Sequence, residues 1–380
     1  MTTEAQFIYV SSQPALDELV AALPNTASLG LDCEADSLHH YREKLCLLQL
    51  SFASRNYIVD PLAGLDLNPL LTILATKELI LHDAGYDLRL LHRHSGFQHR
   101  GDLFDTMLAA QLLGFKQLGL AAVVERICGV SLSKGSQKAD WSRRPLSERL
   151  RQYACNDTRY LLELTKYLRA DLQAKGRLDW HRESCQHLVR TATEAASNSP
   201  PGDWRRLKGL GRMSGRERVF AKQLWRWRDR TARTRDLPHF KVLGDKDLTE
   251  LAAWAARRGA PFNPLPRLPR NIKGRTQTDI QTALKLAASA PDEKWPARQP
   301  RKNRIKLPAN YVALTETLRS ECSRLAMSLD LDPTVIASRA KLEAIIRARP
   351  ASLDDITAAG PLRRWQAVLL EPSIRLVLGK

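Results

Sequence analysis

The 380-residue sequence lacks any Cys-x-x-Cys pair, and its six cysteines are scattered along the chain. This spacing indicates neither a disulfide framework nor a thiolate zinc site, so we expect reduced, mostly buried thiols. No stretch approaches the roughly 18 uninterrupted apolar residues that a membrane span needs, and the first residues lack the basic stretch of a secretory signal. We therefore expect a soluble cytoplasmic protein that does not bind membranes.

A phosphate-binding loop of the form Gly-x-x-x-x-Gly-Lys-Ser/Thr is also missing. Gly followed by Lys occurs only at Gly379-Lys380, which excludes an ATP-driven motor. Acidic residues are scarce in the second half of the chain. Residues 1–200 hold 22 Lys and Arg against 23 Asp and Glu, whereas residues 201–380 hold 37 against 18. The basic half is predicted to bind a nucleic acid, and a solvated helical surface is the alternative.

The length indicates two or three domains, and the residue pattern changes along the chain. The first 110 residues alternate short apolar runs with helical patterns, which predicts an α/β domain with a mixed sheet. From Leu118 onward the strand pattern disappears, and Ser147–Lys175 predicts one long amphipathic helix followed by a shorter one to about Thr193. The predicted strands are Phe7–Val10, Ser28–Asp32, Leu45–Ala53, Tyr57–Val59 and Leu79–His82. The predicted helices are Ala15–Ala22, Pro69–Ala75, Tyr86–His94 and Thr106–Leu113.

Two Pro-rich, polar segments divide the rest of the chain, which is helical in pattern throughout. The predicted organisation is an α/β domain at 1–194, a linker at 195–204, a helical bundle at 205–289, a second linker at 290–308 and a second bundle at 309–380. In the basic half, Arg205–Lys208, Arg226–Arg228 and Arg298–Lys306 are candidate phosphate contacts, with Trp225 and Trp227 as stacking surfaces or core residues. We expect one of the two tryptophans to be buried.

Several carboxylates occupy positions where a purely structural protein would seldom place them. Asp32 and Glu34 are two residues apart at the end of a strand pattern, so they project from the same face and repel each other. Asp157 interrupts the apolar stripe of the predicted long helix, one turn after Tyr153. A buried carboxylate is costly unless it is paired or bound to a cation. Asp87 falls in the first turn of a predicted helix, where stabilisation of the helix dipole is the simpler explanation.

Taken together, these four carboxylates fit one chemistry. They offer only hard oxygen ligands, which suit Mg²⁺ or Mn²⁺ better than Zn²⁺. Two such ions about 4 Å apart can activate a water molecule and stabilise the leaving oxygen of a phosphodiester. Tyr153 is placed to orient the attacking water.

Three motifs give the sequence its resemblance to a known family. They are Asp32-Cys-Glu34, His82 followed five residues later by Asp87, and Tyr153-x-x-x-Asp157. Phe104-Asp-Thr106 and Asp140–Arg149 strengthen the match. The chain resembles the ribonuclease D family, in the tyrosine-containing (DEDDy) branch of the DnaQ-like 3′→5′ exonucleases.

The resemblance implies a ribonuclease H-like fold that carries two metal ions and releases nucleotides from a 3′ end. Asp32, Glu34, Asp87 and Asp157 would be the metal ligands and Tyr153 the water-orienting residue. Asp83 competes with Asp87, and only the spacing from His82 favours the latter. The candidate substrate contacts are Glu34, which could bind the terminal ribose 3′-OH, together with His82, Arg143 and Arg144. For the two arginines a structural salt bridge remains open, as does an N-cap role for Asp105.

The basic half is similar to HRDC domains, which are small helical nucleic-acid-binding bundles. Phe240–Ala252 and Asn271–Gly274 carry this resemblance in the first bundle, and 309–378 resembles a more divergent second copy. We therefore expect a monomeric 3′→5′ exoribonuclease that uses two Mg²⁺ or Mn²⁺ ions and trims structured RNA such as tRNA precursors. A DNA-directed 3′→5′ exonuclease and a non-catalytic RNA-binding scaffold are the alternatives.

Overall fold

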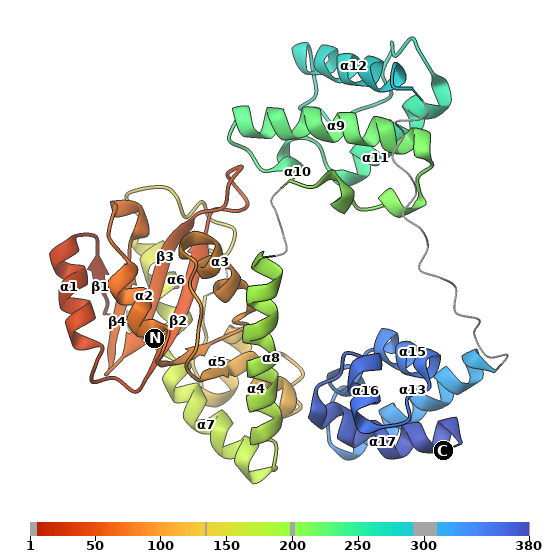
Figure 1. Cartoon of the computed structure of the whole chain (residues 1–380). Helices are drawn as coiled ribbons and strands as arrows, with labels where there is room; N and C mark the ends of the chain where they lie inside the picture. Colours follow the sequence, from red (N-terminus) through yellow and green to blue (C-terminus); the bar gives the residue numbers. More distant parts are fainter. Residues whose placement is uncertain (1–5, 134, 198–201, 292–309, 380) are drawn as a thin grey trace. The chain divides into compact units, whose positions relative to one another are not determined.

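The computed structural model of the chain describes residues 6–133, 135–197, 202–291 and 310–379 (Figure 1). The chain forms two compact bodies. The first is drawn from residues 1–35, 45–198 and 304–380, and the second from residues 36–44 and 199–303. All but two residues of the predicted linker at 290–308 lie outside the described residues, and so does the whole basic stretch Arg298–Lys306. Four residues of the predicted linker at 195–204 also lie outside them.

A mixed six-stranded sheet forms the centre of the first body. Its strand order is β1-β4-β3-β2-β5-β6, in which β3 runs antiparallel to both of its neighbours and the other pairs are parallel. The two strands at its centre, β2 and β3, place Asp32 opposite Gln49 and Gly30 opposite Ser51. The strands are β1 (Ile8–Val10), β2 (Ser28–Ala35), β3 (Leu45–Phe52), β4 (Arg55–Val59), β5 (Glu78–Leu81) and β6 (Leu103–Asp105).

Helices cover both faces of this sheet (Figure 1). One face carries alternate apolar residues of β2, such as Leu29 and Leu31, and packs against leucines of α1, α2 and α3. The opposite face, which carries Ile58 of β4, packs against Ala154 and Cys155 of α6. The helices of the α/β domain are α1 (Gln13–Ala22), α2 (Asn68–Leu74), α3 (Gly85–Ser95), α4 (Thr106–Leu112), α5 (Leu120–Cys128), α6 (Glu148–Arg159), α7 (Leu161–Ala174) and α8 (Leu178–Ser197).

The last helices of the chain belong to the same compact body. Trp365 of the C-terminal bundle stacks on Trp180 of α8, with ring centroids 4.7 Å apart. The buried Arg177 donates hydrogen bonds to the carbonyls of Leu112 and Leu329, one on each side of this contact. The bundle comprises α13 (Tyr311–Ser328), α14 (Pro333–Ile336), α15 (Arg339–Ala348), α16 (Leu353–Ala359) and α17 (Arg364–Leu378).

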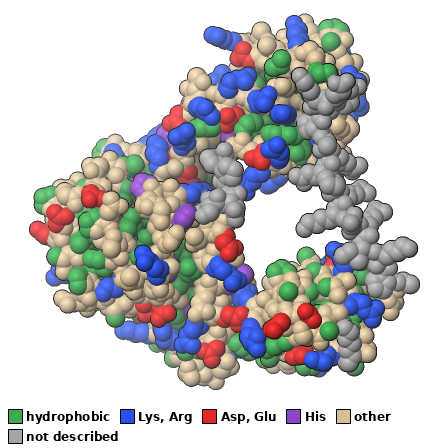
Figure 2. All heavy atoms as spheres, viewed as in Figure 1, with side chains coloured by type: hydrophobic (Ala, Val, Ile, Leu, Met, Phe, Trp, Pro, Cys, Tyr) green, Lys and Arg blue, Asp and Glu red, His purple; other side chains and the backbone are tan. Residues whose placement is uncertain are grey.

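The second body is a helical bundle with its own apolar core. Trp227 is buried in this core, as we expected of one of the two tryptophans, and Trp225 packs partly buried at its edge. Arg228 is also buried and forms an ion pair with Asp245, so it is not an exposed phosphate contact. Lys and Arg side chains are prominent on the face of this body drawn in Figure 2. Its main helices are α9 (Gly215–Thr234), α10 (His239–Val242), α11 (Asp245–Arg258) and α12 (Arg275–Ala288).

The sequence prediction of one long helix over Ser147–Lys175 is wrong in one respect. The segment forms two helices, α6 and α7, which meet at Tyr160, where α6 ends and α7 begins. The apolar stripe continues across this junction, so hydrophobic periodicity alone does not reveal the break. Among the described residues no helix is both long and apolar enough to cross a membrane.

Candidate active site

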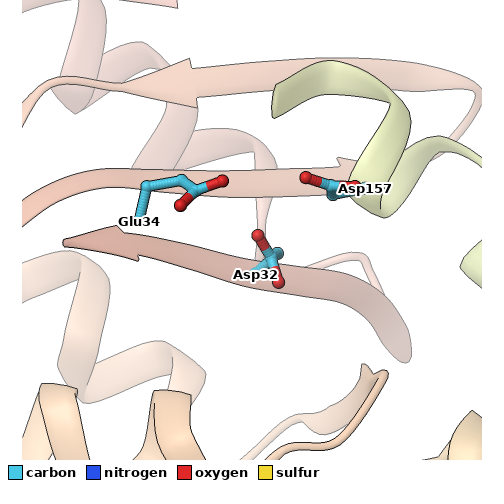
Figure 3. A group of neighbouring side chains, drawn as sticks. All are labelled: Asp32, Glu34 and Asp157. Atoms are coloured by element: carbon cyan, nitrogen blue, oxygen red, sulfur yellow. The ribbon is translucent and has the colours of Figure 1, made fainter. Parts of the chain in front are cut away.

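Three carboxylates from two elements converge on the α6 face of the sheet (Figure 3). Asp32 and Glu34 project from β2 and Asp157 from α6. One oxygen of each carboxylate lies within 4.8 Å of the others, and all three side chains are partly buried. The sequence predicted that Asp32 and Glu34 share a face, and the structure shows that Asp157 points at them.

A close approach between β2 and α6 makes this convergence possible. Gly30 lies on the same face as Asp32, and a Cβ atom at this position would stand 3.1 Å from the carbonyl oxygen of Thr158. The hydroxyl of Thr158 is 2.7 Å from that of Ser51, which faces Gly30 across the β2–β3 pair. Gly30 and the hydrogen bond between Ser51 and Thr158 therefore set the distance between α6 and the sheet. This distance determines where Asp157 lies relative to β2.

The three carboxylates are electrostatically frustrated. Burial raises the pKa of Asp32 to about 7. Burial, followed by the charges of Asp32 and Asp157, raises the pKa of Glu34 well above its ordinary value, and burial with the charge of Asp32 does the same for Asp157. Among the described residues, no Lys or Arg contributes to these three shifts.

Asp87 approaches the same group from another side. It lies in the first turn of α3 and is 4% exposed. Burial and then the charge of Asp32 raise its pKa, while the backbone N–H of Cys33 lowers it. Its charge is also the largest electrostatic contribution to the raised pKa of the Cys33 thiol. Because Cys33 alternates with Asp32 on β2, Asp87 lies beside the strand, outside the three-carboxylate group. Its competitor Asp83 is exposed.

Tyr153 faces the carboxylates from α6, one turn before Asp157. Its pKa is raised by burial and then by the charges of Asp157, Glu34 and Asp32. Its hydroxyl therefore keeps its proton at neutral pH. A hydrogen bond with Gln137 acts in the opposite direction, and the ring packs 6.0 Å from that of Trp141. The sequence reasoning missed Gln137, and nothing in its spacing from the motifs marks it.

The chemistry of this donor set suits a hard divalent cation. Carboxylates alone offer the oxygen ligands that Mg²⁺ and Mn²⁺ prefer, and a bound cation would offset the repulsion that raises their pKa values. The acidic cluster is thus consistent with the use of a divalent metal.

The two arginines predicted to contact the substrate differ in their partners and exposure. All five N–H groups of Arg144 are engaged, by Asp60 and by the carbonyls of Cys46, Trp141 and Arg143. The structural ion pair that the sequence left open is therefore the observed one, and Arg144 is not a phosphate contact. In contrast, the Arg143 side chain is 82% exposed, and its Nε donates a hydrogen bond to Asp140 at 3.1 Å.

His82, a predicted substrate contact, and Asp105, a predicted N-cap, both connect the sheet to its helices. His82 contacts the hydroxyl of Thr106 through Nδ1, and burial lowers its pKa to about 4. Asp105 is fully buried and caps α4 by accepting hydrogen bonds from the N–H groups of Met107 and Leu108. It also accepts one from Ala84 at the start of α3. Neither side chain belongs to the carboxylate group.

Comparisons with known proteins identify the family of the chain. Residues 7–173 match the family of 3'-5' exonuclease domains, and residues 217–257 match the HRDC domain. A ribonuclease D from Jannaschia sp. is 32% identical over 87% of this chain and 86% of its own length. The chain belongs to the ribonuclease D family. A ribonuclease D from Sphingobium indicum is 30% identical over 84% of each chain.

Solved structures extend the likeness to the fold of nearly the whole chain. The structure of Escherichia coli RNase D, described as an exoribonuclease involved in structured RNA processing, has a TM-score of 0.73 and 24% identity, covering 98% of this chain and 99% of that one. Family membership and the exonuclease domain make the chain a 3′→5′ exoribonuclease. The alternative of a DNA-directed enzyme is thereby disfavoured at the level of the family.

Proposed function

We propose that this exoribonuclease removes nucleotides one at a time from the 3′ end of RNA, releasing 5′-monophosphates, at a site of two divalent metal ions. The observation that carries the proposal is the group of three partly buried carboxylates whose oxygens lie within 4.8 Å of one another. Burial raises the pKa of all three, the charges of neighbouring carboxylates add to this for Glu34 and Asp157, and no cationic side chain is among the causes. Mg²⁺ and Mn²⁺ both suit the oxygen donors.

The positions and charges of the carboxylates support two metal ions that share Asp32 as a ligand. Asp32, Glu34 and Asp157 would hold one ion, because their oxygens lie within 4.8 Å of one another. Asp32 and Asp87 would hold the second, since the charge of Asp32 acts directly on Asp87. When bound, the pair of ions supplies an activated water and stabilises the leaving oxygen of the phosphodiester.

Two protein groups would position the reactants. Tyr153 keeps its phenolic proton, so it orients the attacking water by hydrogen bonding and does not act as a base. Glu34 lies at the end of β2 and is available to accept a hydrogen bond from the terminal ribose 3′-OH. The exposed guanidinium of Arg143 would bind the phosphate backbone.

We propose tRNA precursors as the substrate, with the basic helical bundles holding the folded part of the RNA. The excess of Lys and Arg in residues 201–380 supports this assignment. The C-terminal bundle would be a second HRDC copy. In both bundles a long helix precedes a four-residue helix at a proline, and the residue after each short helix is extended, Leu243 at φ −157° and Ala337 at φ −155°.

A direct test follows a tRNA precursor labelled at either end during incubation with Mg²⁺ or Mn²⁺. We expect the 3′ label to be released first as a mononucleotide, and excess EDTA to stop the reaction. Asp157→Asn should lower kcat by about two orders of magnitude or more. Asp17→Asn, an exposed carboxylate on α1, is the matched control and should act like the wild type.

Three results would contradict the proposal: release of the 5′ label first, undiminished activity in EDTA, or wild-type turnover by Asp157→Asn. Preferential digestion of a matched DNA strand would support a DNA-directed enzyme instead. No digestion of either strand by folded protein that also fails to bind Mn²⁺ would support a non-catalytic scaffold.

A further inference from the structure

A buried glutamine on the strand beside Asp32 has no structural explanation. Gln49 is 0% exposed. Neither its Oε1 nor its Nε2 atom has a hydrogen-bond partner, and among the described residues it is the only side chain with both a buried donor and a buried acceptor in this state. An amide removed from water without partners destabilises a folded protein, whereas an apolar side chain of the same size would not.

The sheet register places this amide next to the proposed ligands. Gln49 of β3 is directly opposite Asp32 of β2, so the two side chains emerge on the same face. The flanking pair, Gly30 and Ser51, touches Thr158 of α6, which shows that this face lies under the helix that carries Asp157.

The neighbour of Gln49 on the other adjacent strand is apolar. On the far side from Asp32, Gln49 is opposite Ile58 of β4. Ile58 packs with Ala154 and Cys155 of α6 in a small apolar cluster. The carboxylate of Asp32 is therefore the acceptor that the register brings nearest to the Gln49 amide.

We propose that Gln49 is a positioning residue of the active site: its side-chain N–H groups, which have no partner in this structure, would turn to the adjacent Asp32 carboxylate when a divalent cation binds and fix the orientation of that carboxylate. The amide acts through Asp32 and does not itself touch the RNA. This inference rests on the proposed metal site. It explains why a side chain that costs stability occupies a fully buried position beside a frustrated carboxylate.

The test compares Gln49→Leu and Gln49→Met with the wild type, using Leu47→Met as a matched control. Leu47 lies on the same strand, is fully buried and is opposite Glu34. Four quantities are measured: the urea midpoint in EDTA, the Mn²⁺ affinity by calorimetry, and kcat and KM on a short RNA. Both Gln49 variants should match or exceed the wild-type midpoint. They should bind Mn²⁺ about ten- to a hundredfold more weakly and lose kcat with little change in KM.

Leu47→Met should leave all four quantities near the wild-type values. Unchanged Mn²⁺ affinity in both Gln49 variants would overturn the inference, as would a lower urea midpoint in EDTA, which would assign the amide to structural hydrogen bonding. If Asp32→Asn itself binds Mn²⁺ normally, the proposed metal site fails as well, so the two failures are distinguishable.

Discussion

At the scale of single residues, Asp32 connects the whole site. Its charge contributes to the raised pKa values of Glu34, Asp87, Asp157 and Tyr153. In the metal-free protein these groups resist ionisation together, because each ionised carboxylate makes the next one costlier. Asp32 destabilises the fold in this way and stands at the centre of the site, as expected if, as we propose, its role is to bind a cation.

The pH dependence of stability should report this exchange. Between about pH 4 and pH 7 the folded chain keeps a proton on Asp32 that the unfolded chain has released, because the folded pKa is about 7 and the ordinary value is 3.8. The contribution of Asp32 to the free energy of unfolding therefore falls as the pH rises through this window.

Asp32→Asn should remove that contribution. In EDTA at pH 8, urea denaturation should show the variant to be more stable than the wild type by an amount on the order of a few kcal/mol, and the difference should shrink toward pH 4. Saturating Mn²⁺ should stabilise the wild type and not the variant. A variant that is less stable than the wild type at pH 8 would show that Asp32 is held by stabilising contacts instead.

Much of this site could be predicted from the sequence at the residue scale. The motif spacing selected Asp32, Glu34, Asp87, Tyr153 and Asp157, and the structure brings them around one strand end. Arg144 could not be assigned, because three of its five hydrogen bonds reach back to Cys46 and Asp60, 98 and 84 residues earlier in the chain. Contacts of that range leave no local pattern.

At the scale of elements, the site depends on how closely α6 packs against β2. Gly30 is the residue that permits this approach, since its neighbours are the backbone of Thr158 and the Cβ atom of Leu161 at 3.3 Å. A methyl group there would have to displace backbone at the junction of α6 and α7. The same two helices were expected as one, because their apolar stripe gives no sign of the break at Tyr160.

Gly30→Ala should therefore lower both stability and activity. We expect a loss of about 1–3 kcal/mol in the free energy of unfolding by urea, together with weaker Mn²⁺ binding as Asp157 moves away from Asp32. Gly119→Ala is the matched control, because Gly119 has a φ of −65° and no atom lies within 4 Å of the added Cβ. Equal effects of the two substitutions would refute the role of Gly30.

Strand β6 is the one strand of the sheet that the sequence analysis did not predict. Its three residues, Leu103–Asp105, pair with β5 at the edge of the sheet. A three-residue strand is too short to show an alternating pattern, and Asp105 within it is an N-cap for the following helix. The other five strands were all predicted within a few residues of their observed ends.

At the scale of the whole molecule, the proposed function divides hydrolysis and RNA binding between the two halves of the chain. The acidic site lies in a half with nearly balanced charge, and the Lys and Arg excess lies in the helical half. The C-terminal bundle nevertheless shares a compact body with the exonuclease domain. Glu183 of α8 accepts hydrogen bonds from the N–H groups of Arg364 and Trp365 at the start of α17.

This attachment predicts a local effect of Trp365→Ala. Loss of the stack on Trp180 should increase hydrogen exchange in α8 and the protease sensitivity of the bundle, with a cost of about 3–5 kcal/mol to the packing there. Turnover of short oligonucleotides should stay within about twofold of the wild type. Leu376→Ala, at a position of α17 that is 73% exposed, is the control. Unchanged exchange in α8 would show that the bundle is held by other contacts.

Anomalous diffraction from crystals of the full chain soaked in Mn²⁺ tests the central claim most directly. We predict peaks at the manganese edge beside the carboxylates of Asp32, Glu34 and Asp157, with Asp87 adjoining, and no peaks there in Asp32→Asn crystals. Clear electron density for these side chains without any anomalous peak among them would contradict the account.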